Sequence, residues 1–387
     1  MHKSVLGKYW FAMPCDESFV SELSRAFGIS DFLARILSDR VSSIDHAGKY
    51  LDPKLKSLLP DPFHLKDMDL AVDRLIKAIS LKEKICIFAD YDVDGATSSA
   101  LIKNVLRQIQ VDSEIYVPDR IVEGYGPSIE AMEKIKGKGT ALIITVDCGS
   151  VAFDALEHAS RLKMDVIVID HHISMDKLPE AVAVINPNRL DEISEYKNLA
   201  AVGVSFLFLV ALISRLKENG YFIKNNIAIP NLISQLDIVA LGTVCDVMQL
   251  TGLNRAFVAQ GLKVAKARGN IGYKTLCDIA NIQEAINCYH LGFILGPRIN
   301  AGGRVGRSSL GANLLSTISI SEATKIAEEL DMHNQERKAI EIIMLDEAME
   351  KASRQENDPM LFVAGEGWHP GVIGIVAGRL KEKYNKP

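Results

Sequence analysis

The sequence predicts an α/β protein in which a parallel sheet is covered by helices on both faces and a long helix leads to a second, incomplete α/β domain. Short runs rich in Ile and Val alternate with helical windows across residues 84–185. Strands buried on both faces read as such continuous apolar runs, and helices between them make parallel connections. A helical pattern without internal Gly or Pro covers 321–355, and only one strand-like run follows it.

The expected elements follow from apolar runs and from the three- and four-residue spacing of apolar side chains. We expect strands at residues 85–89, 115–118, 142–146, 166–169, 182–185 and 361–364. We expect helices at 32–37, 68–79, 98–109, 153–162, 200–216, 232–241, 321–355 and 372–384. One strand cannot form a sheet, so the second domain is expected to be completed by a partner or cut short.

With 387 residues, 48% of them hydrophobic, the chain has the composition of a globular protein with two or three domains. We divide it into an N-terminal helical segment (1–75), a sheet-containing domain (76–250), a helical and Gly/Arg-rich connection (251–320), the long helix (321–356) and the start of the second domain (357–387).

Several classes of protein are disfavoured by composition. No window approaches 18 apolar residues, and the N-terminus lacks the apolar region of a signal peptide, so we expect a cytoplasmic protein without membrane contact. The six cysteines are scattered without a CxxC pair, which disfavours a zinc ribbon or a disulfide framework. The net charge of -5 indicates that any contact with nucleic acid is local.

Acidic and imidazole side chains follow three of the expected strands, at the point where each strand ends. In chain order they are Asp90, Asp92, Asp94, Asp147, Asp170, His171 and His172. The carboxyl ends of parallel strands meet at one edge of a sheet, which is where ligands bind. Carboxylates so close together repel one another unless divalent cations lie among them. Each group alone also has a simpler interpretation as a solvated loop, a helix cap or surface histidines.

A fourth acid, Asp246, follows an apolar helix. It completes a set with enough donors for two ions sharing a bridging carboxylate: Asp92, Asp94, Asp147, His172 and Asp246. Carboxylate and imidazole ligands without thiolate favour Mn²⁺ or Mg²⁺ over structural zinc. Two such ions about 3.5 to 4 Å apart generate a hydroxide and stabilise charge at a phosphoryl centre. The sequence therefore predicts phosphoester hydrolysis.

The ordered motifs DYDVDG (90–95), TVDCGS (145–150), DHH (170–172) and GTVCD (242–246) resemble those of the DHH phosphoesterase family. The resemblance implies that the five residues of the predicted set are metal ligands, with Asp147 the bridge. It implies that His171 lies beside the metals as a further catalytic residue, and that Asp90 and Asp170 support the ligands. Many relatives have a histidine where this chain has Phe88, which bears on the occupancy of one metal site.

Two further segments are similar to the single-strand-specific DNA exonucleases of the family. They are PDR followed by EGYG at 118–126, and GPRINA followed by GR at 296–304. Arg forks bind phosphate, a Gly-rich stretch exposes backbone N–H groups, and a Tyr ring can stack on a base. The residues assigned to the 5′ phosphate or the nearby backbone are Arg120, Tyr125, Arg298, Asn300 and Arg304.

By this resemblance the chain would be a two-metal 5′ to 3′ exonuclease that acts on single-stranded DNA in repair and recombination. Its partners would be DNA with a 5′ end and, through the family alone, a helicase or a single-strand-binding protein. The family continues through the rest of a DHHA1 domain and an OB-fold, neither of which we find in this sequence. The alternatives are an enzyme for short oligonucleotides or cyclic dinucleotides, and an inactive scaffold or truncated fragment.

Overall fold

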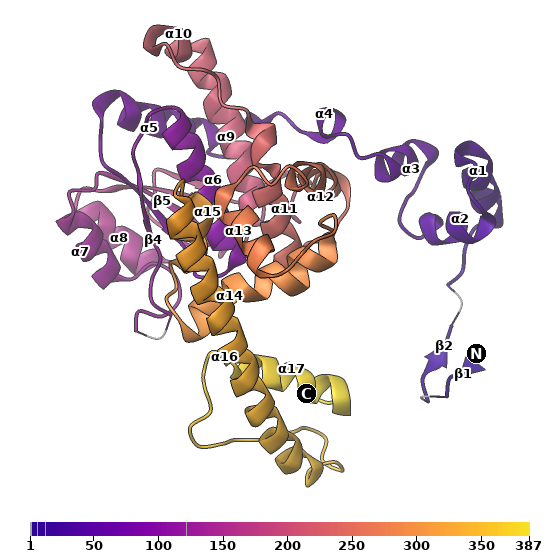
Figure 1. Cartoon of the computed structure of the whole chain (residues 1–387). Coiled ribbons are helices and arrows are strands. Elements are labelled where there is room, and N and C mark those ends of the chain that lie inside the picture. The colour runs from indigo at the N-terminus through magenta and orange to yellow at the C-terminus, as the bar shows by residue number, and fades with distance from the viewer. Residues whose placement is uncertain (1, 6, 12, 121) are drawn as a thin grey trace. The chain divides into compact units, whose positions relative to one another are not determined.

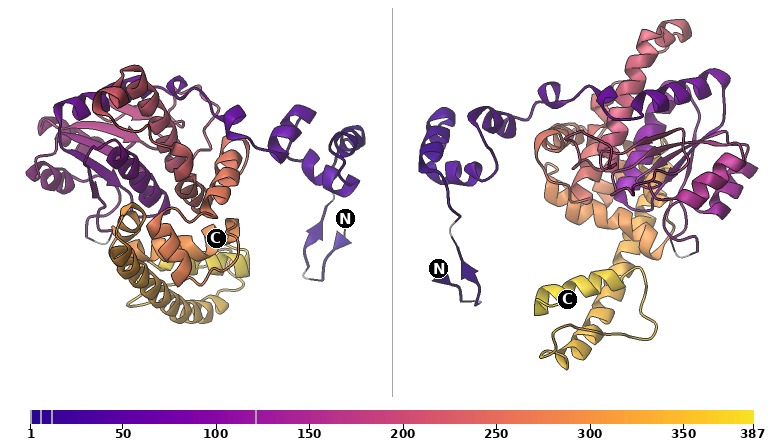
Figure 2. Two further views of the ribbon diagram at one scale, coloured as in Figure 1. Left: turned by 45° about the horizontal axis from the view of Figure 1, so that its top comes forward. Right: turned by 180° about the vertical axis from the view of Figure 1, so that it is seen from behind.

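A computed structural model describes the chain except residues 1, 6, 12 and 121 (Figures 1 and 2). It contains two compact units. One comprises Met1–Leu59 with Leu250–Ala256, and the other comprises Pro60–Gln249 with Phe257–Pro387.

The smaller unit is a small helical cluster preceded by a hairpin that the sequence did not predict. Its elements are β1 (His2–Lys3), β2 (Tyr9–Trp10), α1 (Glu17–Phe27), α2 (Asp31–Ser38), α3 (Ile44–Leu51) and α4 (Leu55–Leu58). Asp16, Ser30 and Ser43 cap the first three helices by accepting backbone N–H groups with their side chains. Val20, Leu23 and Ala34 belong to a buried core of this unit.

The larger unit is built on a five-stranded parallel sheet, which confirms the predicted fold class. The strands are β3 (Ile85–Ala89), β4 (Glu114–Tyr116), β5 (Leu142–Val146), β6 (Asp165–Ile169) and β7 (Ala183–Ile185). Their order across the sheet is β4-β3-β5-β6-β7. Each lies within one or two residues of its predicted range.

Helices cover both faces of this sheet (Figure 1). On one face α7 (Ile129–Gly137) and α8 (Phe153–Arg161) pack on buried side chains of the strands. On the other face lie α5 (Met68–Leu81), α6 (Val93–Gln108) and α9 (Ala201–Glu218). Most of α9 is buried all around, as expected of a helix inside a protein. The helix expected at 98–109 begins earlier, at Val93, directly after the acidic loop.

A layer of helices continues the larger unit beyond the sheet. It consists of α10 (Tyr221–Asn225), η2 (Leu232–Gln235), α11 (Leu236–Cys245), the part of α12 (Gly252–Ala265) that follows Ala256, α13 (Ile271–Ile279), the π-helical turn η3 (His290–Leu295), α14 (Gly296–Val305) and α15 (Leu310–Ser316). The single helix expected at 232–241 is thus a 3₁₀ turn followed by α11. Both α11 and α15 pack against α6, the helix that begins at the acidic loop.

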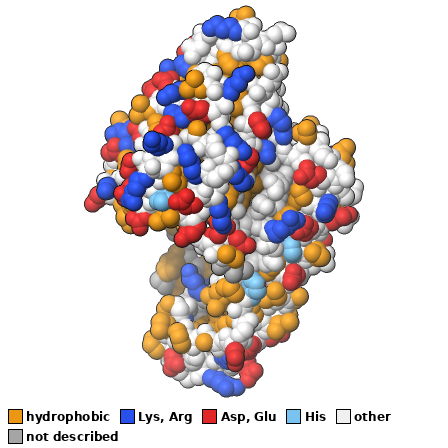
Figure 3. All heavy atoms as spheres, turned by 90° about the vertical axis from the view of Figure 1, so that its left-hand side faces the viewer, with side chains coloured by type: hydrophobic (Ala, Val, Ile, Leu, Met, Phe, Trp, Pro, Cys, Tyr) orange, Lys and Arg blue, Asp and Glu red, His pale blue; other side chains and the backbone are white. Residues whose placement is uncertain are grey.

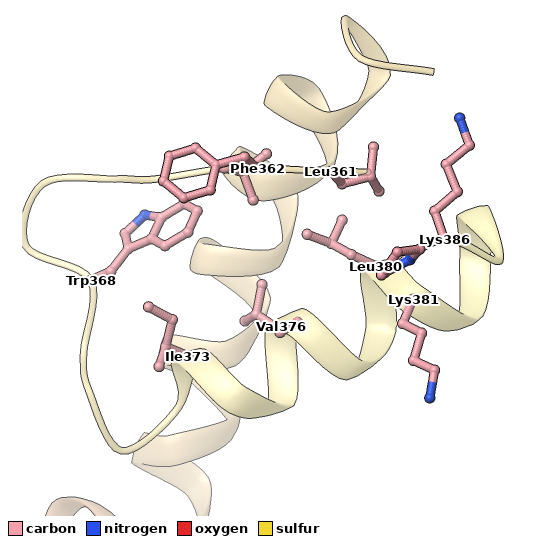
Figure 4. A pocket seen from close by; sticks show the side chains of 11 residues that line it. Leu361, Phe362, Trp368, Ile373, Val376, Leu380, Lys381 and Lys386 are labelled. Atoms are coloured by element: carbon pink, nitrogen blue, oxygen red, sulfur yellow. The ribbon is translucent and has the colours of Figure 1, made fainter. Parts of the chain in front are cut away.

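The long helix is α16 (Ile320–Ser353), which confirms the prediction at 321–355. The chain then returns, and α17 (Ile373–Tyr384) packs against α16 (Figure 2). The strand predicted at 361–364 does not form. Leu361 donates its backbone N–H to Pro387 (3.0 Å) and Phe362 donates to the side chain of Gln355. Among the described residues no neighbouring strand pairs with this segment, so its apolar side chains instead line a groove of about 180 Å³ against α17 (Figure 4).

Within the described part of the chain, no helix combines the length and apolar character that crossing a bilayer requires. On the face drawn in Figure 3, Lys and Arg side chains are interspersed with Asp and Glu side chains. A nucleic-acid-binding surface must therefore be sought at particular sites and not over this whole face.

Candidate metal centre

The register of the sheet brings the ends of four strands to one edge. Ala89 pairs with Val146, Val146 with Ile169, and Ile169 with Ile185. The next residue on three of these strands continues the ladder, since the N–H groups of Asp90, Asp147 and Asp170 donate to the neighbouring strand at 3.3, 3.0 and 3.1 Å. The three acids therefore leave the sheet side by side.

Asp92 caps α6 and folds the loop after β3 tightly. Its Oδ1 accepts the N–H groups of Asp94 (2.9 Å) and Gly95 (3.0 Å). A Cβ on Gly95 would lie 2.3 Å from the carbonyl oxygen of Asp90. Because only glycine fits there, the loop can bring three acids together within five residues.

Asp94 is held by the first turn of α9. Its two carboxylate oxygens accept the N–H groups of Ala201 (2.6 Å) and Val202 (2.9 Å), donors that have no partner within their own helix. These charge-assisted bonds fix a carboxylate that is almost fully buried.

Asp147 lies at the centre of the edge and is 2% exposed. Its φ of 60° places it in the left-handed region, which Asp and Asn tolerate better than most residues. Strain of this kind persists where the surrounding structure fixes it, often at functional sites.

Asp170 organises the two histidines that follow it. Its Oδ1 accepts the backbone N–H groups of His171 (2.7 Å) and His172 (3.1 Å) and contacts Nδ1 of the His172 ring (2.8 Å). Its Oδ2 accepts the N–H of Ser150 (3.0 Å). With Nδ1 engaged by Asp170, His172 has Nε2 left for a ligand.

His171 lies among three acids. Its Nε2 is 3.2 Å from Oδ1 of Asp147, 3.6 Å from Oδ2 of Asp246 and 3.8 Å from Oδ2 of Asp94. This nitrogen is buried and makes no hydrogen bond with the residues that the structure describes, and the same holds for Oδ2 of Asp246 and Oδ1 of Asp90. Buried polar atoms are normally paired, so these unpaired atoms fit a site for cations.

Three overlapping groups have ligand atoms within 4.8 Å of one another. They are Asp147 with His171 and His172, Asp94 with His171 and Asp246, and Asp90 with Asp92 and Asp147. Asp147 and His171 each belong to two groups. The structure thus brings together every residue of the predicted ligand set, and Asp90, expected only as a support, also offers an oxygen.

The acids of the cluster raise one another's pKa, because neighbouring negative charges disfavour ionisation. Burial raises the pKa of Asp90 to about 7, with repulsion from Asp92 next in size. Burial, followed by Asp92, raises the pKa of Asp246 to about 6. The pKa values of Asp94 and Asp147 are raised well above the usual range by burial and by neighbouring acids. Cations bound here would stabilise the ionised carboxylates.

The histidines differ from each other. The hydrogen bond with Asp170 raises the pKa of His172 to about 8. Burial, followed by the charge of His172, lowers the pKa of His171. Although burial alone would raise it, the pKa of Asp170 is lowered by the hydrogen bond with His172. The lowered pKa of His171 favours its neutral form, which is the form that binds metals.

Two residues predicted to bind phosphate lie beside this cluster of acids and histidines. The guanidinium of Arg120 lies 5.0 Å from the centre of the Tyr91 ring. The Tyr125 hydroxyl donates to the carbonyl oxygen of Asp147 (3.5 Å), and its ring meets His172 edge-on at 6.3 Å between centroids.

For the segment at 296–307, the structure corrects the expectation of a Gly-rich stretch with exposed backbone N–H groups. The segment is not a loop that exposes N–H groups, because residues Gly296–Val305 form α14 and use those groups within the helix. The glycines allow close packing instead, since a Cβ on Gly303 would lie 2.8 Å from the carbonyl oxygen of Tyr91. Asn300 accepts the N–H of Val93 (3.1 Å) and so joins α14 to the acidic loop.

The two arginines of α14 are placed differently. Arg304 donates to the carbonyl oxygen of Gly371 (2.9 Å), and burial followed by the charge of Arg120 lowers its pKa. Arg298 donates to Asp331 of α16 (2.8 Å) and to the carbonyl oxygen of Ile294 (2.8 Å). Its guanidinium is thus engaged in joining α14 to α16.

Phe88, at the position where many relatives have a histidine, is fully buried and stacks on Tyr116 with 5.4 Å between ring centroids. Its side chain belongs to the core under α7 and α8. No side chain from position 88 therefore joins the three groups of acids and histidines.

Sequence reasoning missed two asparagines. Asn186 Nδ2 donates to Ser150 and to the carbonyl oxygen of His172 (both 2.8 Å), and Asn188 Nδ2 donates to the carbonyl oxygen of His171 (2.6 Å). Asn186 follows β7 directly, so the rule that located the acids at strand ends would also have located it.

The comparisons with known proteins agree with this geometry. The sequence profile described as the DHH family, N-terminal domain, matches residues 84–243. A crystal structure of exonuclease RecJ bound to manganese is 30% identical, covers 85% of this chain and 80% of that chain, and superimposes with a TM-score of 0.74. The chain belongs to the RecJ family.

Curated RecJ proteins share more sequence. The single-stranded-DNA-specific exonuclease RecJ of Salmonella typhimurium is 40% identical over 349 residues, or 88% of this chain and 60% of that protein. The RecJ of Bacillus subtilis is 35% identical over 382 residues, or 98% of this chain and 46% of that protein. The chain thus spans about half to three fifths of the length of these RecJ relatives.

Proposed function

We propose that this chain carries the catalytic centre of a two-metal exonuclease that hydrolyses single-stranded DNA from the 5′ end. The observation that carries the proposal is the convergence of acids and histidines at one sheet edge, with buried ligand atoms that have no hydrogen-bond partner in the described part of the chain. The names of the RecJ relatives supply the substrate class.

The proposed ligands of Mn²⁺ or Mg²⁺ are the five residues of the predicted set, Asp92, Asp94, Asp147, His172 and Asp246. We add His171 to them because its Nε2 faces three of the acids. All lie within the proposed catalytic domain, 76–250. Bound ions would supply a hydroxide nucleophile and stabilise charge on the phosphoryl group.

The chain's own residues would position the strand. Arg120 and Arg304 would hold a phosphate, since both are cationic and lie beside the acidic loop. Tyr125 would close the site next to His172, and Asp170 would fix the orientation of the His172 ring. A cytoplasmic location and repair proteins as partners belong to the same proposal.

The test compares 5′-phosphorylated DNA strands of two and of thirty nucleotides, each with Mn²⁺. We expect faster degradation of the longer strand and early release of a label placed at its 5′ end. A preference for the two-nucleotide strand would favour the alternative, an enzyme for short oligonucleotides. Early release of a 3′ label would contradict the proposed polarity.

A further inference from the structure

Residues 186–200 join β7 to α9 and make hydrogen bonds with the backbone of both histidines of the metal centre. Asn186, the first residue after β7, donates with Nδ2 to the carbonyl oxygen of His172 (2.8 Å). Asn188 donates with Nδ2 to the carbonyl oxygen of His171 (2.6 Å). A segment that contains none of the proposed metal ligands is therefore bonded to two of them.

The amides of these two asparagines have no donor left for another role. Nδ2 of the buried Asn186 also donates to Oγ of Ser150, a residue that follows β5 (2.8 Å). Nδ2 of Asn188 also donates to the carbonyl oxygen of Lys197 (2.9 Å), and its backbone N–H donates to Oδ1 of Asn186 (2.8 Å). An amide nitrogen has two hydrogens to donate, and all four are used. The network thus links the chain that follows β5, β6 and β7.

The segment is itself fixed by two buried charged side chains. Arg189 donates to Oδ2 of Asp67 (2.6 Å) and to the carbonyl oxygen of Val184 (2.7 Å). Glu192 accepts the backbone N–H of Lys66 (2.9 Å). Hydrogen bonds that involve a charged group are stronger than neutral ones. Contacts with the chain before α5 and with β7 therefore hold the segment, and with it the two asparagines, in place.

The other end of the segment also contacts the proposed ligands. His171 has a backbone hydrogen bond with Leu199. Since Nε2 of His171 has no hydrogen-bond partner among the described residues, we assign this bond to Nδ1, which leaves Nε2 directed at the acids. The segment then continues into α9, whose first turn donates two N–H groups to Asp94. Groups that hold a metal-binding side chain in this way determine its orientation.

We propose that Asn186 and Asn188 are positioning residues for the metal centre. They hold the backbone of His171 and His172 so that both imidazole rings reach the acids, and they act on the ions only through these two histidines. The inference rests on the proposed function and deepens it, because it assigns the geometry of the centre to a segment that supplies no metal ligand.

The first test measures Mn²⁺ binding to the full chain by isothermal titration. Asn188→Ala should bind Mn²⁺ roughly ten- to hundredfold more weakly, the usual effect of removing a group that orients a metal ligand. The matched control is Asn270→Ala, because Asn270 is also half-buried and caps α13 with hydrogen bonds to Leu315 and Tyr273. It should lower the melting temperature about as much and leave the Mn²⁺ affinity unchanged. Equal affinity of Asn188→Ala and the parent, or equal losses in both variants, would overturn the inference.

A second variant separates positioning from charge. Asn188→Asp keeps the shape of the side chain but replaces the amide donors by oxygens, so the bond to the carbonyl oxygen of His171 is lost. The added negative charge would by itself attract a cation. Loss of Mn²⁺ affinity in Asn188→Asp is therefore expected from the positioning role alone. An affinity equal to or higher than that of the parent would count against that role.

The third test measures degradation of the thirty-nucleotide strand at saturating Mn²⁺. Asn188→Ala should lower kcat and leave KM unchanged, because a positioning residue acts on the reacting centre and not on the bound strand. A raised KM at unchanged kcat would assign Asn188 to strand binding and contradict the inference.

These measurements also separate the inference from the proposed function. If the parent binds Mn²⁺ but degrades no strand, and Asn188→Ala still loses Mn²⁺ affinity, the proposed function fails and the positioning role stands. If the parent degrades the strand and Asn188→Ala matches it in Mn²⁺ affinity and in kcat, the function stands and the positioning role fails.

Discussion

At Asp147 the chain turns into the left-handed region directly after a buried strand, and it does so with a carboxylate that has almost no contact with solvent. Burial and four neighbouring acids raise the pKa of that carboxylate. The side chain is therefore unfavourable for the stability of the metal-free protein. If this carboxylate is the proposed shared ligand of two cations, the positive charge of the ions would reverse this electrostatic cost.

We predict that Asp147→Asn folds but no longer binds Mn²⁺ tightly. Asn also tolerates a left-handed backbone, and it removes a buried charge, so the melting temperature without metal should rise by roughly 2 °C. The Mn²⁺ affinity should fall by at least about tenfold, as a lost interaction of 1.4 kcal/mol requires. Isothermal titration and thermal unfolding provide the two measurements.

The control for this variant is Asp154→Asn, which removes an exposed carboxylate from α8 outside the cluster. It should leave both quantities unchanged. Retention of the parent's Mn²⁺ affinity by Asp147→Asn would exclude Asp147 as a bridging ligand.

The residues of the cluster could be predicted because acids at the ends of neighbouring parallel strands must meet. The groups that hold these side chains in place were harder to predict from the sequence. Backbone N–H groups of Ala201 and Val202 bind Asp94. Every residue except proline has such a donor, so the residue types at these positions do not reveal the interaction. Which of the two histidine rings lies nearer to the acids also depends on ring orientation, which a sequence does not specify.

Among the elements, α11 approaches α6 closely because Gly242 has no side chain. A Cβ at Gly242 would lie 2.3 Å from Oγ1 of Thr97 and 3.1 Å from Oδ1 of Asp94. The same helix ends at Asp246, its C-cap. The distance between these two helices therefore determines how far Asp246 lies from Asp94.

We predict that Gly242→Ala destabilises the protein and weakens Mn²⁺ binding together, because α11 must move away from α6. Overpacking of this kind costs about 1 to 3 kcal/mol. Gly137→Ala is the matched control, since nothing lies within 4 Å of a Cβ at that helical position and its φ is not positive. It should be neutral or slightly stabilising. Chemical denaturation and metal titration of both variants check the prediction, and equal stability of the two would contradict it.

Comparison of the predicted with the observed elements shows where sequence patterns are enough to locate a helix or a strand. The strands of the sheet are apolar runs with pairing partners, and they were located closely. The run at 361–364 has the same composition but no strand to pair with among the described residues. Residues 296–305 form a helix despite three glycines, because contacts with Tyr91 and with α16 outweigh their low helix propensity.

For the whole molecule, the cluster makes stability depend on pH. The pKa of Asp90 is raised to about 7 and that of Asp246 to about 6, so the folded state binds more protons than the unfolded state in this range. The pKa of His172, raised to about 8, acts in the same direction. Stability from all three is present at lower pH and lost as pH rises through these values.

We therefore predict that the metal-free protein unfolds at a lower temperature at pH 8.5 than at pH 6.5, by roughly 5 °C. The lowered pKa of His171 acts in the opposite direction, but only slightly at pH 6.5 and above, because an unfolded histidine is at most about half protonated there. Excess Mn²⁺ should raise both melting temperatures and remove most of the difference, because it binds ionised carboxylates. Thermal unfolding by circular dichroism measures this, and a higher melting temperature at pH 8.5 without metal would refute it.

One side-chain amide links α14, the helix of the proposed phosphate ligand Arg304, to the acidic loop. Asn300, on α14, accepts a hydrogen bond from the N–H of Val93, the residue that follows Asp92. If a bound strand moved α14, the shift would be transmitted through this bond to the proposed metal ligands. Thermodynamic linkage then requires reciprocity: the factor by which a bound strand tightens Mn²⁺ is the factor by which Mn²⁺ tightens the strand. Metal and DNA would act as mutual cofactors in binding, before any bond is broken.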